Sequence, residues 1–199
     1  MIRRPTGPRK ETRLQRRIAI SVIGFVGLSG SGKTTLIAGV IPFLTQAGLR
    51  VAVLKHARHG FDMDHPGKDS FRAREAGARQ VLVASRDRWV LMGETLPRAE
   101  EPAFHELLGR FDSREIDLVL AEGFASESYP KIEVYRPSHG KPPKCWPEDP
   151  DVCAVATDEL LAVGAPVVRL DLHRLDLVAE YVLTASPVAH RPLEVSHAD

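Results

Sequence analysis

The sequence predicts a three-layer α/β fold built on a mostly parallel sheet. Short apolar runs rich in β-branched residues occur at 18–26 and at 51–54, and between them the stretch 33–47 places apolar residues at helical spacing. A strand, a helix and a second strand in immediate succession form a βαβ unit, whose two strands must run parallel. The first 54 residues therefore already favour the parallel α/β class.

The later elements continue this alternation. Further strands are expected at 116–121, 131–135, 152–156 and 167–170, and further helices at 70–76, 102–111 and 175–183. Two strand-like segments at 79–84 and 88–92 flank a polar turn and predict an inserted β-hairpin region, in which Trp89 is expected to pack. Because buried strands alternate with helices, helices should cover both faces of the sheet.

The charge distribution separates a basic leader from a mildly acidic body. Residues 1–17 carry seven arginines and lysines against Glu11, although the net charge of the 199-residue chain is only +1. We expect 1–17 to be a disordered tail and 186–199 a loose C-terminal tail. The segment 18–185 is expected to form one nucleotide-binding domain, with 79–93 as its hairpin insertion.

Composition argues against several classes of partner. No apolar run approaches the roughly 20 residues that span a bilayer, and the body shows no basic surface typical of nucleic-acid binding. Cys145 and Cys153 are the only cysteines and lack the spacing of a metal site, which suits a reducing compartment. We expect a cytoplasmic protein with no membrane or nucleic-acid partner.

A phosphate-binding motif lies between the first predicted strand and the first predicted helix. The segment Gly27–Thr34 matches the pattern Gly-x4-Gly-Lys-Ser/Thr. Glycines let backbone N–H groups point inward at phosphates, Lys33 can neutralise the β- and γ-phosphates, and the Thr34 hydroxyl suits Mg²⁺. The sequence thus predicts a P-loop NTPase fold. The expected nucleotide-binding residues are Gly27, Ser29, Gly30, Ser31, Gly32, Lys33, Thr34 and Thr35.

Three carboxylates are candidates for the metal and for catalysis. Glu122 ends the apolar run at 116–121, where a P-loop protein holds Mg²⁺ from a neighbouring strand, although a solvent-facing carboxylate would look the same. Asp62 and Asp64 lie in the polar loop after the second strand. The expected metal ligands are Thr34, Glu122 and Asp62, and the expected catalytic residues are Lys33, Asp64 and Glu122. Asp62 and Asp64 fit the roles of loop charge or helix cap equally well.

Longer motifs resemble one particular family. The segment 55–78, Lys-His-Ala-Arg-His-Gly-Phe-Asp-Met-Asp-His-Pro-Gly-Lys-Asp-Ser-Phe-Arg-Ala-Arg-Glu-Ala-Gly-Ala, is similar to that of the molybdopterin-guanine dinucleotide biosynthesis adaptor proteins, the MobB family. The segments Leu120–Phe124, Pro130–Val134 and Ala154–Asp158 resemble the same family. The resemblance spans residues 20–175.

The resemblance implies a GTP-binding protein with weak Mg²⁺-dependent hydrolysis. Its partner would be the guanylyltransferase that joins GMP to the molybdenum-pterin cofactor, and direct contact with molybdopterin itself stays open. The resemblance also implies a homodimer, with the hairpin at 79–93 as the contact. Asp158 is the implied reader of guanine, because a carboxylate can accept from N1–H and the 2-amino group together.

Two other functions use the same loop. A small-molecule kinase would need an acceptor pocket, for which the segment 62–74 offers charges of both signs. A metal-inserting GTPase would need a metal site, for which Cys145 and the histidines His56, His59 and His65 are the candidates. A solvated loop, or contacts to phosphate or pterin, is the alternative for these histidines.

Overall fold

The computed structural model describes residues 20–57, 60–93, 103–159 and 167–186. The leader expected at 1–17 lies outside the described residues, as does the C-terminal tail after Ser186. Arg58 and His59, in the segment 55–78, also lie outside the described residues.

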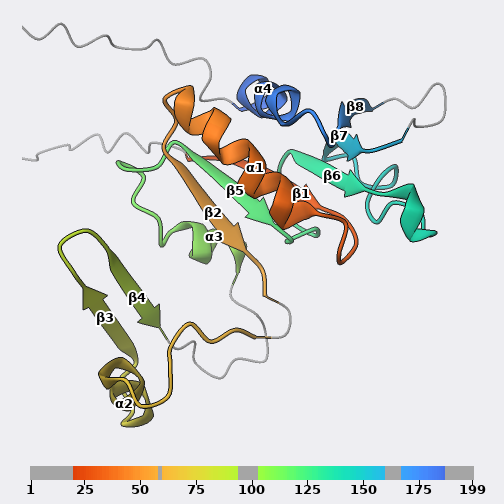
Figure 1. Ribbon diagram of the computed structural model, residues 1–199. Helices are drawn as coiled ribbons and strands as arrows, with labels where there is room; N and C mark the ends of the chain where they lie inside the picture. Colours follow the sequence, from red (N-terminus) through yellow and green to blue (C-terminus); the bar gives the residue numbers. More distant parts are fainter. Residues whose placement is uncertain (1–19, 58–59, 94–102, 160–166, 187–199) are drawn as a thin grey trace, which may run out of the picture.

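Six strands form the main sheet in the described part of the chain, and every neighbouring pair among them is parallel. These strands are β1 (Ser21–Val26), β2 (Val51–Lys55), β5 (Leu118–Glu122), β6 (Lys131–Tyr135), β7 (Val152–Thr157) and β8 (Val168–Asp171). Their order is β2-β5-β1-β6-β7-β8 (Figure 1). The predicted parallel α/β sheet is confirmed. Because the strands are parallel, the carboxyl end of β1 lies between those of β5 and β6.

The register of the central strands brings two glutamates level with the end of β1. Phe25 of β1 pairs with Glu122 of β5, and Val26 pairs with Glu133 of β6. All five residues of β5 are buried, as expected for a central strand covered on both faces.

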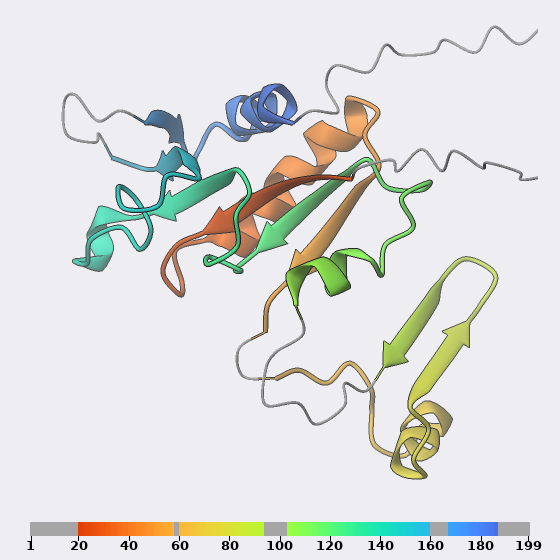
Figure 2. The same cartoon turned by 180° about the vertical axis from the view of Figure 1, so that it is seen from behind.

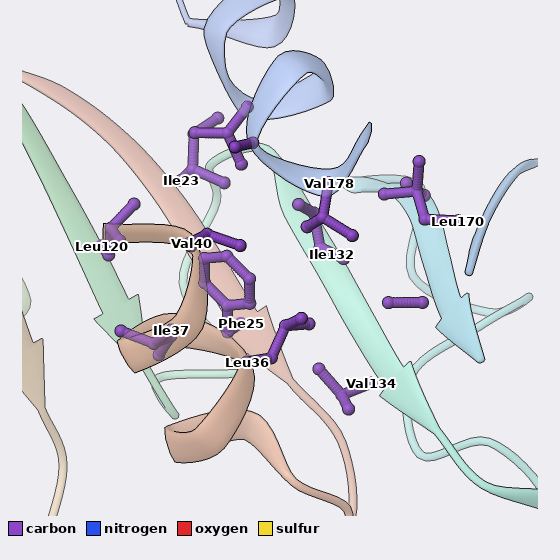
Figure 3. Close-up of a cluster of buried hydrophobic side chains, with 14 of the residues drawn as sticks. Ile23, Phe25, Leu36, Ile37, Val40, Leu120, Ile132, Val134, Leu170 and Val178 are labelled. Carbon is purple, nitrogen blue, oxygen red and sulfur yellow. The ribbon is translucent and has the colours of Figure 1, made fainter. Parts of the chain in front are cut away.

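Two long helices cover one face of the sheet. They are α1 (Lys33–Gln46) and α4 (Leu175–Ala185), which lie on the same side (Figure 1). Their apolar side chains pack on those of the strands, as Figure 3 shows for Leu36 and Val40 of α1 beside Phe25 of β1. Gly48, with a φ of +88°, follows the end of α1, and a glycine in this left-handed conformation commonly terminates a helix.

The opposite face is covered by α3 (Phe104–Leu108) and by the loop 137–150, which contains the short 3₁₀ helix η1 (Pro137–His139). Figure 2 shows α3 on this side. The predicted helical cover of both faces is therefore confirmed in part, since on this face the loop 137–150 covers the sheet together with α3. The helix expected at 102–111 is shorter, because it ends before Gly109, a poor helix former.

Two buried charged residues of β6 anchor the loop 137–150. The Glu133 carboxylate, only 1% exposed, accepts hydrogen bonds from the backbone N–H groups of Lys144, Cys145 (3.0 Å) and Trp146 (2.7 Å). Lys131, also buried, places Nζ 2.8 Å from Oδ2 of Asp149. Burying a charge is costly unless it is paired or hydrogen-bonded. The loop supplies those partners, so sheet and loop stabilise each other.

The predicted hairpin is formed by β3 (Gln80–Ala84) and β4 (Trp89–Gly93), which pair antiparallel in a sheet of their own. The helix α2 (Asp69–Glu75) lies beside it, and both stand away from the main sheet (Figures 1 and 2). Trp89 is 71% exposed, so the expectation that it packs within the hairpin is wrong.

None of the helices in the described ranges is both long and apolar enough to cross a membrane.

Glu133→Gln should destabilise the protein by about 2 kcal/mol, because an amide oxygen accepts the three N–H groups more weakly than a carboxylate does. Urea unfolding followed by circular dichroism measures this change. Glu148→Gln, at an exposed position of the same loop, is the control and should leave the free energy of unfolding unchanged. Equal stabilities of the two variants would contradict the anchoring role of Glu133.

Candidate functional site

The loop between β1 and α1 can adopt its shape only with glycine at particular positions. Gly27, Gly30 and Gly32 have φ values of +133°, +78° and +98°, which side chains disfavour. A β-carbon built on Gly27 would lie 2.4 Å from the carbonyl oxygen of Val134 in β6, a clash with backbone. The sequence pattern therefore encodes a real backbone constraint, and the loop ends at the amino terminus of α1.

Lys33 opens α1 and folds back over this loop. Its Nζ donates to the carbonyl oxygens of Gly27 (3.2 Å) and Leu28 (2.6 Å). Ser29, Gly30 and Thr35 are exposed, whereas Ser31 is buried and its Oγ has no hydrogen-bond partner among the described residues. A positive charge inside a ring of backbone groups at a helix amino terminus is the usual setting for phosphate.

Thr34, in the first turn of α1, meets Glu122 at the end of β5. Thr34 Oγ1 lies 2.8 and 2.9 Å from the two carboxylate oxygens of Glu122, although the residues are 88 positions apart in the chain. Lys55, at the end of β2, places Nζ 3.1 Å from Thr34 Oγ1 and 3.2 Å from Oε1 of Glu122. The three side chains come together because β5 pairs with both β1 and β2.

This donor set suits Mg²⁺. A hydroxyl and a carboxylate are hard oxygen ligands of the kind Mg²⁺ prefers, and the Lys55 ammonium shows that a cation fits against both. Thr34 and Glu122 are the residues that would hold the ion.

His56 packs against the turn that follows Glu122. Gly123 has a φ of +94°, and a β-carbon there would lie 3.0 Å from Cβ of His56. The His56 ring packs against Phe124, with ring centroids 5.1 Å apart, and its backbone N–H donates to Glu122 O. In the described part of the chain, no three His, Cys, Asp or Glu side chains group as metal ligands.

Asp62 and Asp64 are bonded to α2 and to each other. Asp64 accepts hydrogen bonds from Ser70 Oγ (2.8 Å) and Arg74 Nη1 (3.3 Å), and Asp62 accepts from the Asp64 N–H (2.9 Å) and from Arg74 (3.2 Å). The Asp64 N–H, together with Arg74, holds the pKa of the Asp62 carboxyl below its usual value. Here both carboxylates order the loop before α2 rather than joining Thr34, and their roles with metal and water stay predictions.

Arg136 is a residue that sequence reasoning missed. It follows β6 directly, its Nε donates to the carbonyl oxygen of Ser31 in the glycine loop (3.2 Å), and its Nη1 pairs with Oδ2 of Asp158. Asp158 follows β7, so it lies at the same edge of the sheet as the loop. The position of Arg136 just after a predicted strand was the available signal.

A glycine loop between a central parallel strand and its helix, with a carboxylate on the adjacent strand, defines a P-loop nucleotide-binding protein. The model of one family, the molybdopterin guanine dinucleotide synthesis protein B (MobB) family, matches residues 22–158. The chain belongs to this family, as its motifs suggested.

Relatives and solved structures support the same family membership. The chain is 41% identical over 164 residues to the molybdopterin-guanine dinucleotide biosynthesis adapter proteins of Escherichia coli strain K12 and Haemophilus influenzae, which covers 82% of this chain and 92% and 88% of theirs. A crystal structure of molybdopterin-guanine biosynthesis protein B is 28% identical, with a TM-score of 0.61 over 82% of this chain and 98% of that one. A Bacillus subtilis MobB structure is 25% identical with the same TM-score, over 81% and 97% of the two chains.

Lys55→Met should tighten binding of Mn²⁺, a paramagnetic substitute for Mg²⁺, about tenfold in nucleotide-free protein, since it removes a competing cation from Glu122. Electron paramagnetic resonance of free Mn²⁺ gives the dissociation constant. Arg50→Met removes a similar cation from Asp117 at the other end of β5 and should change nothing. Unaltered Mn²⁺ affinity in Lys55→Met would show that Lys55 does not compete for a metal site.

Proposed function

We propose that this chain is an adapter of molybdopterin-guanine dinucleotide biosynthesis that binds GTP with Mg²⁺ and hydrolyses it slowly. Family membership and the adapter relatives support the biosynthetic role. The main structural support for a nucleotide site is the contact of Thr34 with Glu122 next to the glycine loop.

The loop residues would bind the phosphates. Backbone N–H groups of the segment 27–35 cradle the phosphate oxygens, and Lys33 exchanges its carbonyl partners for the β- and γ-phosphates. Thr34 and Glu122 would hold Mg²⁺, and an ion held by them would supply positive charge that stabilises the phosphates. The contacts of Lys33 with Gly27 and Leu28, and of Thr34 with Glu122, support these assignments.

Hydrolysis is expected to be slow because the site supplies little help for the attacking water. Glu122 is engaged by Thr34 and Lys55, and Asp62 and Asp64 are engaged by α2 and its Arg74. None of these carboxylates is thus ready to position water in this arrangement. A binding module that serves another enzyme has no need of fast turnover.

Guanine recognition is assigned to Asp158. Its Oδ1 is buried and makes no hydrogen bond to any described residue, so it can accept one donor of a base, and Oδ2, which uses one lone pair for Arg136, can accept a second. A carboxylate matches the two adjacent donors of guanine, whereas adenine offers it no such pair.

The proposed partner of this adapter is the guanylyltransferase that attaches GMP to molybdopterin. The proposed compartment is the cytoplasm.

Calorimetry with Mg²⁺ should show GTP binding at least tenfold tighter than ATP, because only guanine satisfies Asp158. Lys33→Ala should abolish binding of both nucleotides, whereas Arg110→Ala, which removes an exposed charge beyond α3, should leave it intact. Equal affinity for the two nucleotides, or phosphate transfer from ATP to a small acceptor, would instead favour a small-molecule kinase.

The hairpin is proposed as the contact of a homodimer. Side chains on both of its faces are exposed, among them Leu82 and Trp89 on one face and Val83 on the other. An isolated two-stranded hairpin is marginal in water, and large exposed apolar surface typically marks an interface. Among the described strands, β2 is an edge of the main sheet, and its Val53 is exposed. A second copy could cover these surfaces.

The double variant Leu82→Glu, Trp89→Glu should convert a dimer into a folded monomer, because charges placed there cannot be buried between two copies. Light scattering after gel filtration gives the mass directly. The control is Leu177→Glu, an exposed apolar position on α4, which should stay dimeric. A monomeric wild-type protein, or a dimer that survives the double substitution, would refute this contact.

A further inference from the structure

Arg136 connects two parts of the site that are 127 positions apart in the chain, the phosphate loop at Ser31 and the base-reading candidate Asp158. The connection follows from strand order. β6 lies between β1 and β7, and the three strands are parallel, so residues that follow them gather at one edge. Arg136 follows the middle strand of the three and reaches to both sides.

One arm of the Arg136 guanidinium remains available. Nε is bonded to Ser31 O and Nη1 to Asp158, whereas Nη2 has no hydrogen-bond partner among the described residues. A β-carbon built on Gly32 would lie 3.7 Å from Nη2. Nη2 is therefore close to the end of the glycine loop, directly before Lys33 and Thr34. The side chain is 32% exposed, which leaves it within reach of a ligand.

Within the described ranges, two buried polar atoms beside this arginine have no hydrogen-bond partner. They are Ser31 Oγ and Asp158 Oδ1, each on a residue that Arg136 contacts. Buried polar atoms normally have a hydrogen-bond partner, and an orphaned pair on either side of a guanidinium points to a ligand that completes them. A nucleotide in the glycine loop has donors on its base and acceptors on its phosphates and ribose, which matches both atoms.

We propose that Arg136 is a nucleotide-binding residue that couples phosphate binding to base recognition. Its Nη2 donates to a phosphate oxygen of a bound purine nucleotide, while its Nη1 holds Asp158 in place through one lone pair of Oδ2, which leaves Oδ1 and the second lone pair of Oδ2 for the two donors of guanine. This proposal rests on the proposed nucleotide-binding function. It assigns guanine preference to the Arg136–Asp158 pair rather than to Asp158 alone.

The guanidinium is the only side-chain group suited to this double task. Its planar fork presents five N–H donors in fixed directions, so one group can bond the loop carbonyl, the carboxylate and a phosphate at once. Lysine keeps the charge but concentrates its donors on one atom, which cannot bridge Ser31 O and Asp158 in the same way. Arg136→Lys therefore keeps the positive charge but removes the bridge between Ser31 O and Asp158.

The test is equilibrium binding of Mg²⁺-GTP and Mg²⁺-ATP to the full chain by calorimetry. Arg136→Ala should weaken GTP binding at least tenfold and bring the ratio of GTP to ATP affinity close to one, because both the phosphate contact and the positioning of Asp158 are lost. Arg136→Lys should retain part of the affinity but lose the preference for GTP. In Asp158→Asn, further replacement of Arg136 should have no added effect on that preference, since the two act as one unit.

Arg174→Ala is the matched control, since Arg174 makes a similar pair with Asp176 at the start of α4, away from the loop. It should bind as the wild type does, and circular dichroism should show all variants folded. Selective GTP binding that is unchanged in both Arg136 variants would overturn this inference and leave the proposed function standing. A wild-type protein that binds neither nucleotide would overturn both.

Discussion

The contact between Thr34 and Glu122 is the constraint on which the rest of the site depends. It joins the first turn of α1 to the last residue of β5, and it forms because β1 and β5 are parallel neighbours whose carboxyl ends coincide. A hydroxyl aligned on a carboxylate beneath a glycine loop provides oxygen ligands for a hard cation. Lys55 enters the same cluster from β2, since that strand also pairs with β5.

β6 shapes the other side of the loop. The carbonyl oxygen of Val134 leaves no room for a side chain at Gly27, and Arg136, directly beyond the strand, bonds the loop at Ser31. The same strand buries Lys131 and Glu133, whose charges are satisfied by the long loop that follows. Packing of the sheet and geometry of the site are therefore not independent, because one short strand contributes to both.

The fold was largely predictable because strands and helices alternate with clear periodicity, and each strand of the main sheet lies within two or three residues of its expected bounds. Lys33, Thr34 and Glu122 were recognisable because the first two belong to a local pattern and the third ends an apolar run. Arg136 and Lys55 were not, because their partners depend on strand order, which local patterns do not contain. Asp62 and Asp64 illustrate the same limit, since their bonds to α2 involve a loop geometry that composition alone does not specify.

The nucleotide site can be tested by a crystal structure of the full chain with a non-hydrolysable GTP analogue and Mg²⁺. We expect the β- and γ-phosphates within the loop formed by residues 27–34, with Mg²⁺ bound to Thr34 Oγ1 and held directly or through water by Glu122. Phosphates bound elsewhere on the chain, or Mg²⁺ bound by Asp62 and Asp64 with Glu122 uninvolved, would contradict it.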